Sequence, residues 1–523
     1  MRKLHHFHGG VHPPSNKAQS TRTAIAHAPL PPRLVVPLHQ HAGEAAKPIV
    51  QAGDRVLKGQ LLGMPDGFVS SAVHAPTSGT ISAIDMQLVA HPSGLPNLCA
   101  TLIPDGREEW IAREPVDYRE HSSADLQHLL RMAGVVGLGG AGFPSDIKLR
   151  IGKQKITTLI LNGAECEPYI SCDDMLMRER AGEIVQGAEI LRYMLDADEV
   201  LIGVEDNKPE AIAALQQAIS ASGSTLQQNK RHEVVTIPTI YPGGGAKQLI
   251  RVITGLEVPS GKLPTDIGVQ CFNVATACTV YRALAHGEPL LSRVITITGN
   301  VRRAQNFEAL IGTPITELVA LAGMLPDTSG YIMGGPMMGF PLPALDVPMV
   351  KATNCIIVAS EKLFPPSPPP MPCIRCTRCV DACPADLQPQ DLYWFAQSRE
   401  FGRAQKFSLF DCIECGACSY VCPSHIPLVQ YFRFAKSEIR AREHDKQLAD
   451  QARVRHEFHE QRIEREKREK AEKLAIREKA AQSAKLAGIQ SLTPQQQAAQ
   501  TELEAGRAHI IELAKSEVEH VKE

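Results

Sequence analysis

Two cysteine-rich runs decide the fold of this chain: Cys373-Ile-Arg-Cys376-Thr-Arg-Cys379-Val-Asp-Ala-Cys383-Pro384 and Cys412-Ile-Glu-Cys415-Gly-Ala-Cys418-Ser-Tyr-Val-Cys422-Pro423. Both have the spacing C-x2-C-x2-C-x3-C-P, and together they hold eight of the fourteen cysteines of the 523-residue chain. Three thiolates on one short loop can bind three irons of one cluster, whereas the fourth, three residues further on, points away. The runs therefore predict metal ligation.

The tandem pattern predicts two 4Fe–4S clusters that exchange their fourth ligands. The predicted ligands are Cys373, Cys376, Cys379 and Cys422 for cluster 1, and Cys383, Cys412, Cys415 and Cys418 for cluster 2. Zinc would need four ligands at each site, with spacing nearer two separated CxxC pairs. Disulfides would need an oxidising compartment, and nothing in the sequence suggests one.

The bulk composition is that of a soluble multidomain protein. At about 150 residues per domain, 523 residues predict several domains. Hydrophobic residues make up 43%, charged residues 21%, and the net charge of −2 creates no field that favours nucleic acid. No apolar run reaches about 18 residues, and residues 1–10 lack the apolar core of a secretory signal. We therefore expect a cytoplasmic protein without a transmembrane span, whose membrane association, if any, is peripheral.

An extended arm rich in His, Gly and Pro opens the chain, and two short β-rich halves at 48–63 and 72–84 follow it. The two halves resemble the barrel-sandwich fold of lipoyl and biotinyl domains. Those domains carry a modified lysine on the segment that joins the halves. Here that segment, residues 64–71 (MPDGFVSS), has no lysine. The resemblance therefore implies a scaffold without a swinging arm.

Helix and strand patterns alternate from Ser122 to about Leu284. Ser122 or Ser123 can cap a helix that ends at Gly134. Residues 157–162 and 200–206 have the pattern of buried strands, and residues 209–220 that of a helix. This alternation predicts a parallel α/β sheet.

A different unit begins at Arg293, where strands alternate with one helix at 315–324 and end in a strand at 355–360; a small β-grasp-like domain fits this pattern. The Pro-rich segment 361–372 predicts a semi-rigid extended linker. Between the cysteine runs, residues 388–406 predict one helix.

The tail is dominated by strong helix formers with many i,i+4 charge pairs, and Thr493-Pro494 interrupts it. It is predicted to be a solvated helix or partly disordered arm, and a partner- or membrane-facing helix is the alternative.

The resulting fold class is multidomain, with α/β and α+β parts. The predicted segments are an N-terminal arm (1–47), a barrel-sandwich unit (48–115), an α/β flavin domain (116–290), a β-grasp-like SLBB domain (291–360), a linker (361–372), a double ferredoxin domain (373–435) and a charged tail (436–523).

Residues 137–144 (GLGGAGFP) form a glycine-rich loop. The loop contains G-x-G-x-x-G, but a helix pattern precedes it where a Rossmann fingerprint requires a strand. A run of glycines lets backbone N–H groups approach a planar or anionic group closely. Ser145-Asp146 can cap the next helix, whose N-terminus favours phosphate, and Lys148 is placed one turn further in. The loop is therefore predicted to bind a phosphate-bearing cofactor.

This loop resembles the flavin loop of the 51 kDa, NADH-oxidising subunit of respiratory complex I. Residues 162–168, 241–244 and 273–276 resemble further segments of that family in the same order. The resemblance implies FMN as cofactor and NADH as substrate. By position it implies FMN contacts for Gly139, Gly140, Lys148, Asn162, Glu165, Asn273 and Thr276, and contacts to the nicotinamide nucleotide for Phe143 and Glu167.

The chain departs from that family where acids are expected. Alanine stands at 164 and 275, and Gly245-Ala246 replaces an acidic pair. The flavin-binding groups are retained, whereas acids that would hydrogen-bond NADH are missing. No catalytic residue is assigned, and two roles stay open: NADH oxidation by this chain, or a non-catalytic docking and electron-wire role.

The order of units over roughly residues 3–437 resembles the RnfC (RsxC) family of the Rnf (Rsx) complexes. The resemblance implies a peripheral electron-transfer subunit on the cytoplasmic face of the bacterial inner membrane, in an ion-translocating NADH:ferredoxin-type oxidoreductase. Implied partners are the other proteins of the membrane complex, with ferredoxin or the redox regulator SoxR. A cobalamin reductase of bacterial microcompartments resembles the same architecture and is the alternative. The charged tail argues against it, as does the absence of a short amphipathic N-terminus.

Overall fold

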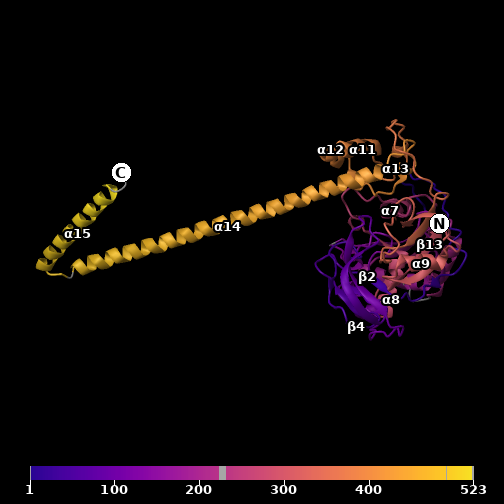
Figure 1. Cartoon of the computed structure of the whole chain (residues 1–523), viewed down its shortest axis with the longest axis horizontal. Coiled ribbons are helices and arrows are strands. Elements are labelled where there is room, and N and C mark those ends of the chain that lie inside the picture. The colour runs from indigo at the N-terminus through magenta and orange to yellow at the C-terminus, as the bar shows by residue number, and fades with distance from the viewer. Residues whose placement is uncertain (1, 153, 223–230, 491, 521–523) are drawn as a thin grey trace. The chain divides into compact units, whose positions relative to one another are not determined.

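The computed structural model describes residues 2–152, 154–222, 231–490 and 492–520 (Figure 1). It forms two compact units, Met1–Ser437 and Glu438–Glu523. The first unit contains the predicted barrel-sandwich, α/β, β-grasp-like and iron–sulfur parts, and the second contains the charged tail. The predicted multidomain fold class is confirmed.

The barrel-sandwich part consists of two small antiparallel sheets. The strands of the first are, in sheet order, β2 (Leu34–Pro37), β8 (Pro96–Pro104), β7 (Gly79–Leu88) and β4 (Arg55–Val56). Those of the second are β3 (Lys47–Pro48), β5 (Leu61–Met64) and β6 (Val73–His74). Buried Leu34, Leu62, Ile81 and Leu102 form the core. Strand β2 lies in the segment predicted as an arm. It pairs with β8, and its four residues are all buried, so this segment belongs to the folded sheet.

The α/β part has one parallel sheet, as predicted. Its strands are, in sheet order, β11 (Arg231–Ile237), β10 (Glu199–Glu205), β9 (Thr158–Gly163) and β12 (Val269–Asn273). Its helices are α1 (Ser123–Met132), α2 (Ser145–Lys148), α3 (Cys172–Glu179), α4 (Ala181–Leu195), α5 (Pro209–Ala221), α7 (Ala246–Thr254) and α8 (Val274–Ala285). Ser122 caps α1 in a capping box with Asp125, which confirms the predicted helix start. The chain builds outward from β9 through β10 to β11 and then returns to the other side at β12.

The β-grasp-like part is a sheet with the order β1 (Ala26–His27), β14 (Gln305–Leu310), β13 (Ser292–Gly299), β17 (Cys355–Ser360), β15 (Thr328–Met333) and β16 (Phe340–Pro341). Helix α9 (Ile315–Ala322) packs on it through buried Ile315, Leu318 and Val319. The first strand comes from the N-terminal arm, so the arm takes part in the folded core.

The iron–sulfur part contains α10 (Arg378–Asp381), α11 (Pro389–Gln397), α12 (Phe401–Lys406), α13 (Ala417–Tyr420) and the start of α14 (Leu428–Gln490). The prediction of one helix over 388–406 is wrong, because α11 ends at Gln397 and Arg399 adopts a left-handed φ of 59°. Ser398 Oγ donates to the Trp394 carbonyl at 2.8 Å, which competes with the helical hydrogen bond. The break lets the Phe395 and Phe407 rings pack together, with their centres 4.9 Å apart.

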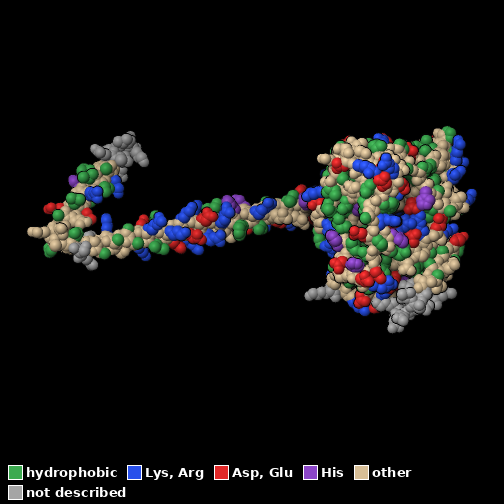
Figure 2. Space-filling view, turned by 90° about the horizontal axis from the view of Figure 1, so that it is seen from below, with side chains coloured by type: hydrophobic (Ala, Val, Ile, Leu, Met, Phe, Trp, Pro, Cys, Tyr) green, Lys and Arg blue, Asp and Glu red, His purple; other side chains and the backbone are tan. Residues whose placement is uncertain are grey.

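The tail is helical, as predicted, in the rest of α14 and in α15 (Pro494–His520). Thr493 Oγ1 donates to Gln496 Oε1 at the start of α15, after the predicted interruption. Figure 2 shows positive and negative side chains mixed along α14. Residues 491 and 521–523 of the predicted tail lie outside the described residues. No described helix is both long and apolar enough to cross a membrane.

Candidate functional site

The eight predicted cluster cysteines lie in two groups of four. Cys373, Cys376, Cys379 and Cys422 line one cavity, which we call the outer cavity. Cys383, Cys412, Cys415 and Cys418 line another, which we call the inner cavity. Each group takes three thiols from one run and the fourth from the other run. Four converging sulfurs are the donor set of a 4Fe–4S cluster, so the residues fit the predicted group.

The two cysteine loops repeat one backbone path. Left-handed φ angles recur at the equivalent positions Arg375 and Glu414, and again at Thr377 and Gly416. Such residues turn the chain sharply, which a short loop needs if its three thiols are to face one point. At Gly416 a side chain is also excluded, because an added Cβ would lie 2.7 Å from the Met337 carbonyl oxygen.

The cysteines of the inner cavity are more deeply buried than those of the outer cavity. Cys383, Cys415 and Cys418 are buried, and Cys376 is exposed. The Tyr241 hydroxyl donates to the Cys415 carbonyl, next to the inner cavity. Burial raises the pKa of the Cys415 thiol to about 12, so a thiolate there needs a cationic metal to stabilise it.

The N-terminal arm packs against the end of the first cysteine run, at Ala382 and the inner-cavity residue Cys383. Gly10 N–H donates to the Ala382 carbonyl at 3.1 Å, and His8 Nδ1 lies 2.8 Å from the Cys383 carbonyl oxygen. A Cβ on Gly9 would lie 2.6 Å from the Ala382 carbonyl carbon. The arm therefore packs closely enough to require glycine there.

Two of the predicted flavin residues meet at the carboxyl edge of the parallel sheet. Asn162 at the end of β9 and Asn273 at the end of β12 are register partners. Strand order reverses between these strands, and open α/β sheets bind ligands at such switch points. A Cβ on Gly139 would lie 3.3 Å from Asn273 Cβ, so the glycine loop passes directly over this edge. Gly140, with a φ of 121°, borders open space.

Helix α8 begins at this edge. Asn273 Oδ1 accepts from the Ala275 and Thr276 amides at 2.9 and 3.3 Å and so caps the helix. Asn273 Nδ2 donates to Asp173 Oδ2 at 2.6 Å. The Leu138 amide donates to Thr276 Oγ1 at 2.9 Å. The capping residues thus hold the glycine loop, α8 and α3 together.

A cavity of about 610 Å³ borders the switch point at Leu138, Asp173 and Ala275. The volume is in the range of small-molecule sites. Three of its lining cations are in ion pairs: Lys58 with Glu108 at 3.1 Å, Arg180 with Glu308, and Arg282 with Glu183 at 2.6 Å. The fourth, Arg293, donates to backbone carbonyls. The cavity therefore offers space beside the loop, but these cations already have protein partners.

The side chains of Lys148 and Asn162, both predicted to bind FMN, contact neighbouring protein groups. The Lys148 ammonium donates to the Cys271 carbonyl and lies 4.6 Å from the centre of the Phe272 ring. Burial lowers the pKa of Lys148. Asn162 Nδ2 donates to the Gly244 carbonyl at 2.8 Å, which ties the two flavin segments together.

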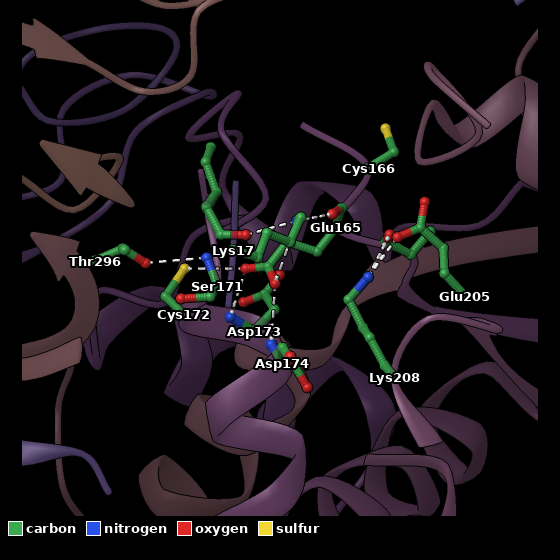
Figure 3. A network of polar contacts seen from close by, with 12 residues as sticks. Lys17, Glu165, Cys166, Ser171, Cys172, Asp173, Asp174, Glu205, Lys208 and Thr296 are labelled. Atoms are coloured by element: carbon green, nitrogen blue, oxygen red, sulfur yellow. Dashed lines mark hydrogen bonds and ion pairs between the residues drawn. The ribbon is translucent and has the colours of Figure 1, made fainter. Parts of the chain in front are cut away.

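Glu165 anchors a buried polar network (Figure 3). Its carboxylate accepts from the Asp173 and Asp174 amides at 2.7 and 3.1 Å, at the start of α3. Lys17 from the arm donates to the Glu165 carbonyl, and to the Ile170 carbonyl at 2.6 Å. Burial, with the Glu165 charge second, raises the pKa of Asp173 to about 7. Sequence reasoning missed Lys17 and Asp173. Two acids shortly after Ser171, at 173 and 174, were a weak cue for a helix start, and nothing local marked Lys17.

The two residues predicted to face the nicotinamide nucleotide lie in different surroundings. The side chain of Phe143 on the glycine loop is 38% exposed. Glu167 accepts from the Met337 and Met338 amides at 2.7 and 3.0 Å, and burial raises its pKa. Its carboxylate therefore ties the α/β part to residues 334–339 of the β-grasp-like part.

Four family profiles match the chain in the predicted order. They are the RnfC barrel sandwich hybrid domain at 5–107, the Nuo51 FMN-binding domain at 130–282, the SLBB domain at 294–341 and a 4Fe-4S dicluster domain at 372–426. These matches confirm the kinds of unit predicted, including a flavin-binding unit and an iron–sulfur unit.

Curated relatives extend over most of the chain. It is 50% identical over 464 residues to the C component of the ion-translocating oxidoreductase complex of Yersinia enterocolitica, covering 88% of this chain and 65% of that relative. It is 49% identical over 468 residues to the protein of the same name from Yersinia pestis, covering 89% and 74%. The chain thus spans less than two thirds of the first relative's length. Among solved structures, an NAD+-reducing NiFe-hydrogenase in the H2-reduced state matches with a TM-score of 0.45 and 18% identity, over 63% of each chain.

Proposed function

The chain belongs to the RnfC family, the C components of ion-translocating oxidoreductase complexes, and we propose that it is the peripheral electron-transfer subunit of such a complex. In this proposal FMN lies at the switch point between β9 and β12, and two 4Fe–4S clusters lie in the inner and outer cavities. When bound, FMN exchanges two electrons as a hydride and passes them on singly, and the clusters carry one electron at a time. The chain's own residues position these groups.

The observation that carries the proposal is the continuous packing between the flavin segment and the inner cavity. Cys166, which lies between Glu165 and Glu167 in the sequence, packs in one cluster with Tyr241 and Cys415. Cys166 Sγ also accepts from the Gly244 amide at 3.2 Å, which joins the two flavin segments. This packing supports electron transfer from the flavin to the inner cluster in the proposed arrangement.

The outer cavity is the place where a redox partner can reach the chain. Residues 374–378 beside it are all exposed, with Ile374 at 68%. The order we propose is flavin, inner cluster, outer cluster, partner. We place NADH at the flavin end and ferredoxin or a redox regulator at the other end of the span, with the other proteins of the complex at the cytoplasmic face of the membrane.

The residues where acids are missing limit how NADH can bind. Ala164 is fully buried, and Gly245 is the N-cap residue of α7, where it provides no side-chain cap. These positions offer only backbone groups to a nucleotide. NADH oxidation therefore depends on the glycine loop and Phe143, and an electron-wire role without NADH oxidation is the competing outcome.

The test uses the full chain, purified without oxygen and supplied with iron, sulfide and FMN. We expect about one FMN and about eight iron atoms per chain. NADH should bleach the flavin band, then the cluster absorbance, and should drive reduction of an artificial acceptor. A flavin that stays oxidised under NADH but is reduced by dithionite would exclude NADH oxidation by this chain and support the electron-wire role. A chain that holds neither flavin nor iron would contradict the whole proposal.

A further inference from the structure

The glycine loop, residues 137–144, is held by groups from outside the α/β part. Three carbonyl oxygens, before the loop, within it and near its end, accept hydrogen bonds from the two neighbouring parts. The acceptors are those of Gly134, Leu138 and Gly142. The donors, which we call the loop clamp, are Lys351 Nζ at 2.8 Å, Arg293 Nη2 at 3.2 Å and Ala42 N at 3.1 Å respectively.

Lys351 lies at the centre of the loop clamp. Its ammonium also donates to the Ala72 carbonyl at 2.7 Å, and its amide donates to Gln40 Oε1 at 3.0 Å. Its carbonyl accepts from Arg293 Nη1. The side chain is fully buried, and no ion pair is recorded for it among the described residues. Burial accordingly lowers its pKa to about 7.

A buried ammonium without a carboxylate is unfavourable unless its donors are satisfied by other groups. Here two carbonyls accept hydrogen bonds from it, one in the barrel-sandwich part and one three residues before the loop. Gly134 has a φ of 72°, and a Cβ there would lie 2.6 Å from the Ala72 carbonyl oxygen and 2.9 Å from Lys351 Nζ. The close approach of the three parts therefore depends on both residues.

We infer that Lys351 is a positioning residue for the flavin, acting through the glycine loop. The barrel-sandwich and β-grasp-like parts supply none of the predicted FMN contacts, yet through the loop clamp they hold the loop's backbone over Asn162 and Asn273. Backbone N–H groups bind a planar or anionic ligand well only when they are held in a fixed orientation. The inference rests on the proposed function of the loop.

Lys351→Met in the full chain tests the inference, because methionine fills the apolar part of the site and removes the ammonium. We expect the Kd for FMN to rise at least about tenfold. Amide hydrogen exchange should speed up in peptides covering residues 135–144. Exchange in β9 and the iron content should stay at the wild-type level, which a general loss of stability would not allow.

Arg192→Met is the matched control. Arg192 is also a buried cation, bonded to Glu189 at 2.7 Å on α4, and it makes none of the loop-clamp contacts. The Arg192→Met change should destabilise the protein, while the Kd for FMN and the amide hydrogen exchange of the loop keep their wild-type values. Gln40→Met removes the acceptor of the Lys351 amide, together with the donor to the Pro37 carbonyl, and leaves the Lys351 ammonium in place. It serves if Lys351→Met does not fold, and we expect a smaller change in the same direction.

The outcomes separate this inference from the function it rests on. Wild-type protein that binds FMN, with Lys351→Met or Gln40→Met binding equally well and showing unchanged loop exchange, would overturn the positioning role. Wild-type protein that binds no FMN would contradict the proposed function instead. In that case loop exchange in the same variants still decides whether Lys351 holds the loop.

Discussion

The predicted cluster ligands and the predicted flavin residues of this chain are brought together in different ways. All eight cysteines lie between Cys373 and Cys422, and each short loop brings three of them together. The predicted flavin residues come from segments spread between Gly139 and Thr276. Contacts from the arm, the barrel-sandwich part and the β-grasp-like part hold those segments in place. Ligands that lie close together in the sequence need only a local loop to face one point. Ligands from separate segments depend on tertiary contacts with distant parts of the chain.

This difference predicts how each site fails. Changes within the cysteine runs should remove iron and leave the flavin. Changes at the caps and buried cations that contact the glycine loop or the start of α8 should weaken flavin binding and leave the iron.

The largest effect is expected from the inner cluster. Cys415→Ala should remove about half of the iron. It should also lower the free energy of unfolding by more than about 4 kcal/mol, because the inner cavity packs against the arm and Tyr241. Iron analysis and urea unfolding measure both. Cys376→Ala at the exposed outer cavity is the matched control and should lose similar iron with a smaller loss of stability. Equal stability losses would contradict the inner–outer distinction.

Asn273→Ala should come next. The cap of α8 contributes about 1 kcal/mol, and leaving buried Asp173 without its donor costs a further 1–3 kcal/mol or so. We expect weaker FMN binding by fluorescence titration, with unchanged iron. Ser122→Ala removes a cap of the same kind from α1, away from the flavin loop, and should lower stability by about 1 kcal/mol without affecting FMN. Loss of FMN in both variants would show that stability alone is measured.

Acid should destabilise the region behind the flavin loop. Burial, with the nearby Lys351 charge second, lowers the pKa of His74 to about 3 from 6.5. Because the unfolded state then binds more protons, this stability is complete above pH 6.5 and declines as the pH falls towards 3. At pH 5 the loss should be about 2 kcal/mol. Urea unfolding at pH 7 and pH 5 measures it, and His74→Gln should reduce the difference. Identical pH dependence in the variant would refute the assignment.

The smallest effect is expected where the two regions meet. Tyr241→Phe removes the hydroxyl that donates to the Cys415 carbonyl and should cost about 1 kcal/mol. Iron and FMN contents should both stay at wild-type values, because Tyr241 binds neither group directly in this arrangement. Loss of either cofactor would mean that the contact holds a site in place as well as joining the two parts.

Periodicity and caps predicted much of the fold. The helix after Ser122, the parallel sheet and the helical tail are all present. The single helix over 388–406 was wrong because helix propensity does not reveal a left-handed residue such as Arg399. The assignments of FMN and NADH residues remain predictions. The structure brings Asn162, Asn273 and Gly139 together, and it turns Glu167 towards the β-grasp-like part.

The sequence by itself determined the cysteine pattern that predicts the cluster ligands, because three thiols on a loop of seven residues can face a common point. It also determined that a glycine loop lies near a helix start. Only the tertiary structure decided what holds that loop. Ala42, Arg293 and Lys351 act from 95 or more residues away from it. Hydrogen bonds between parts depend on distances in the folded chain, so they leave no pattern of spacing in the sequence.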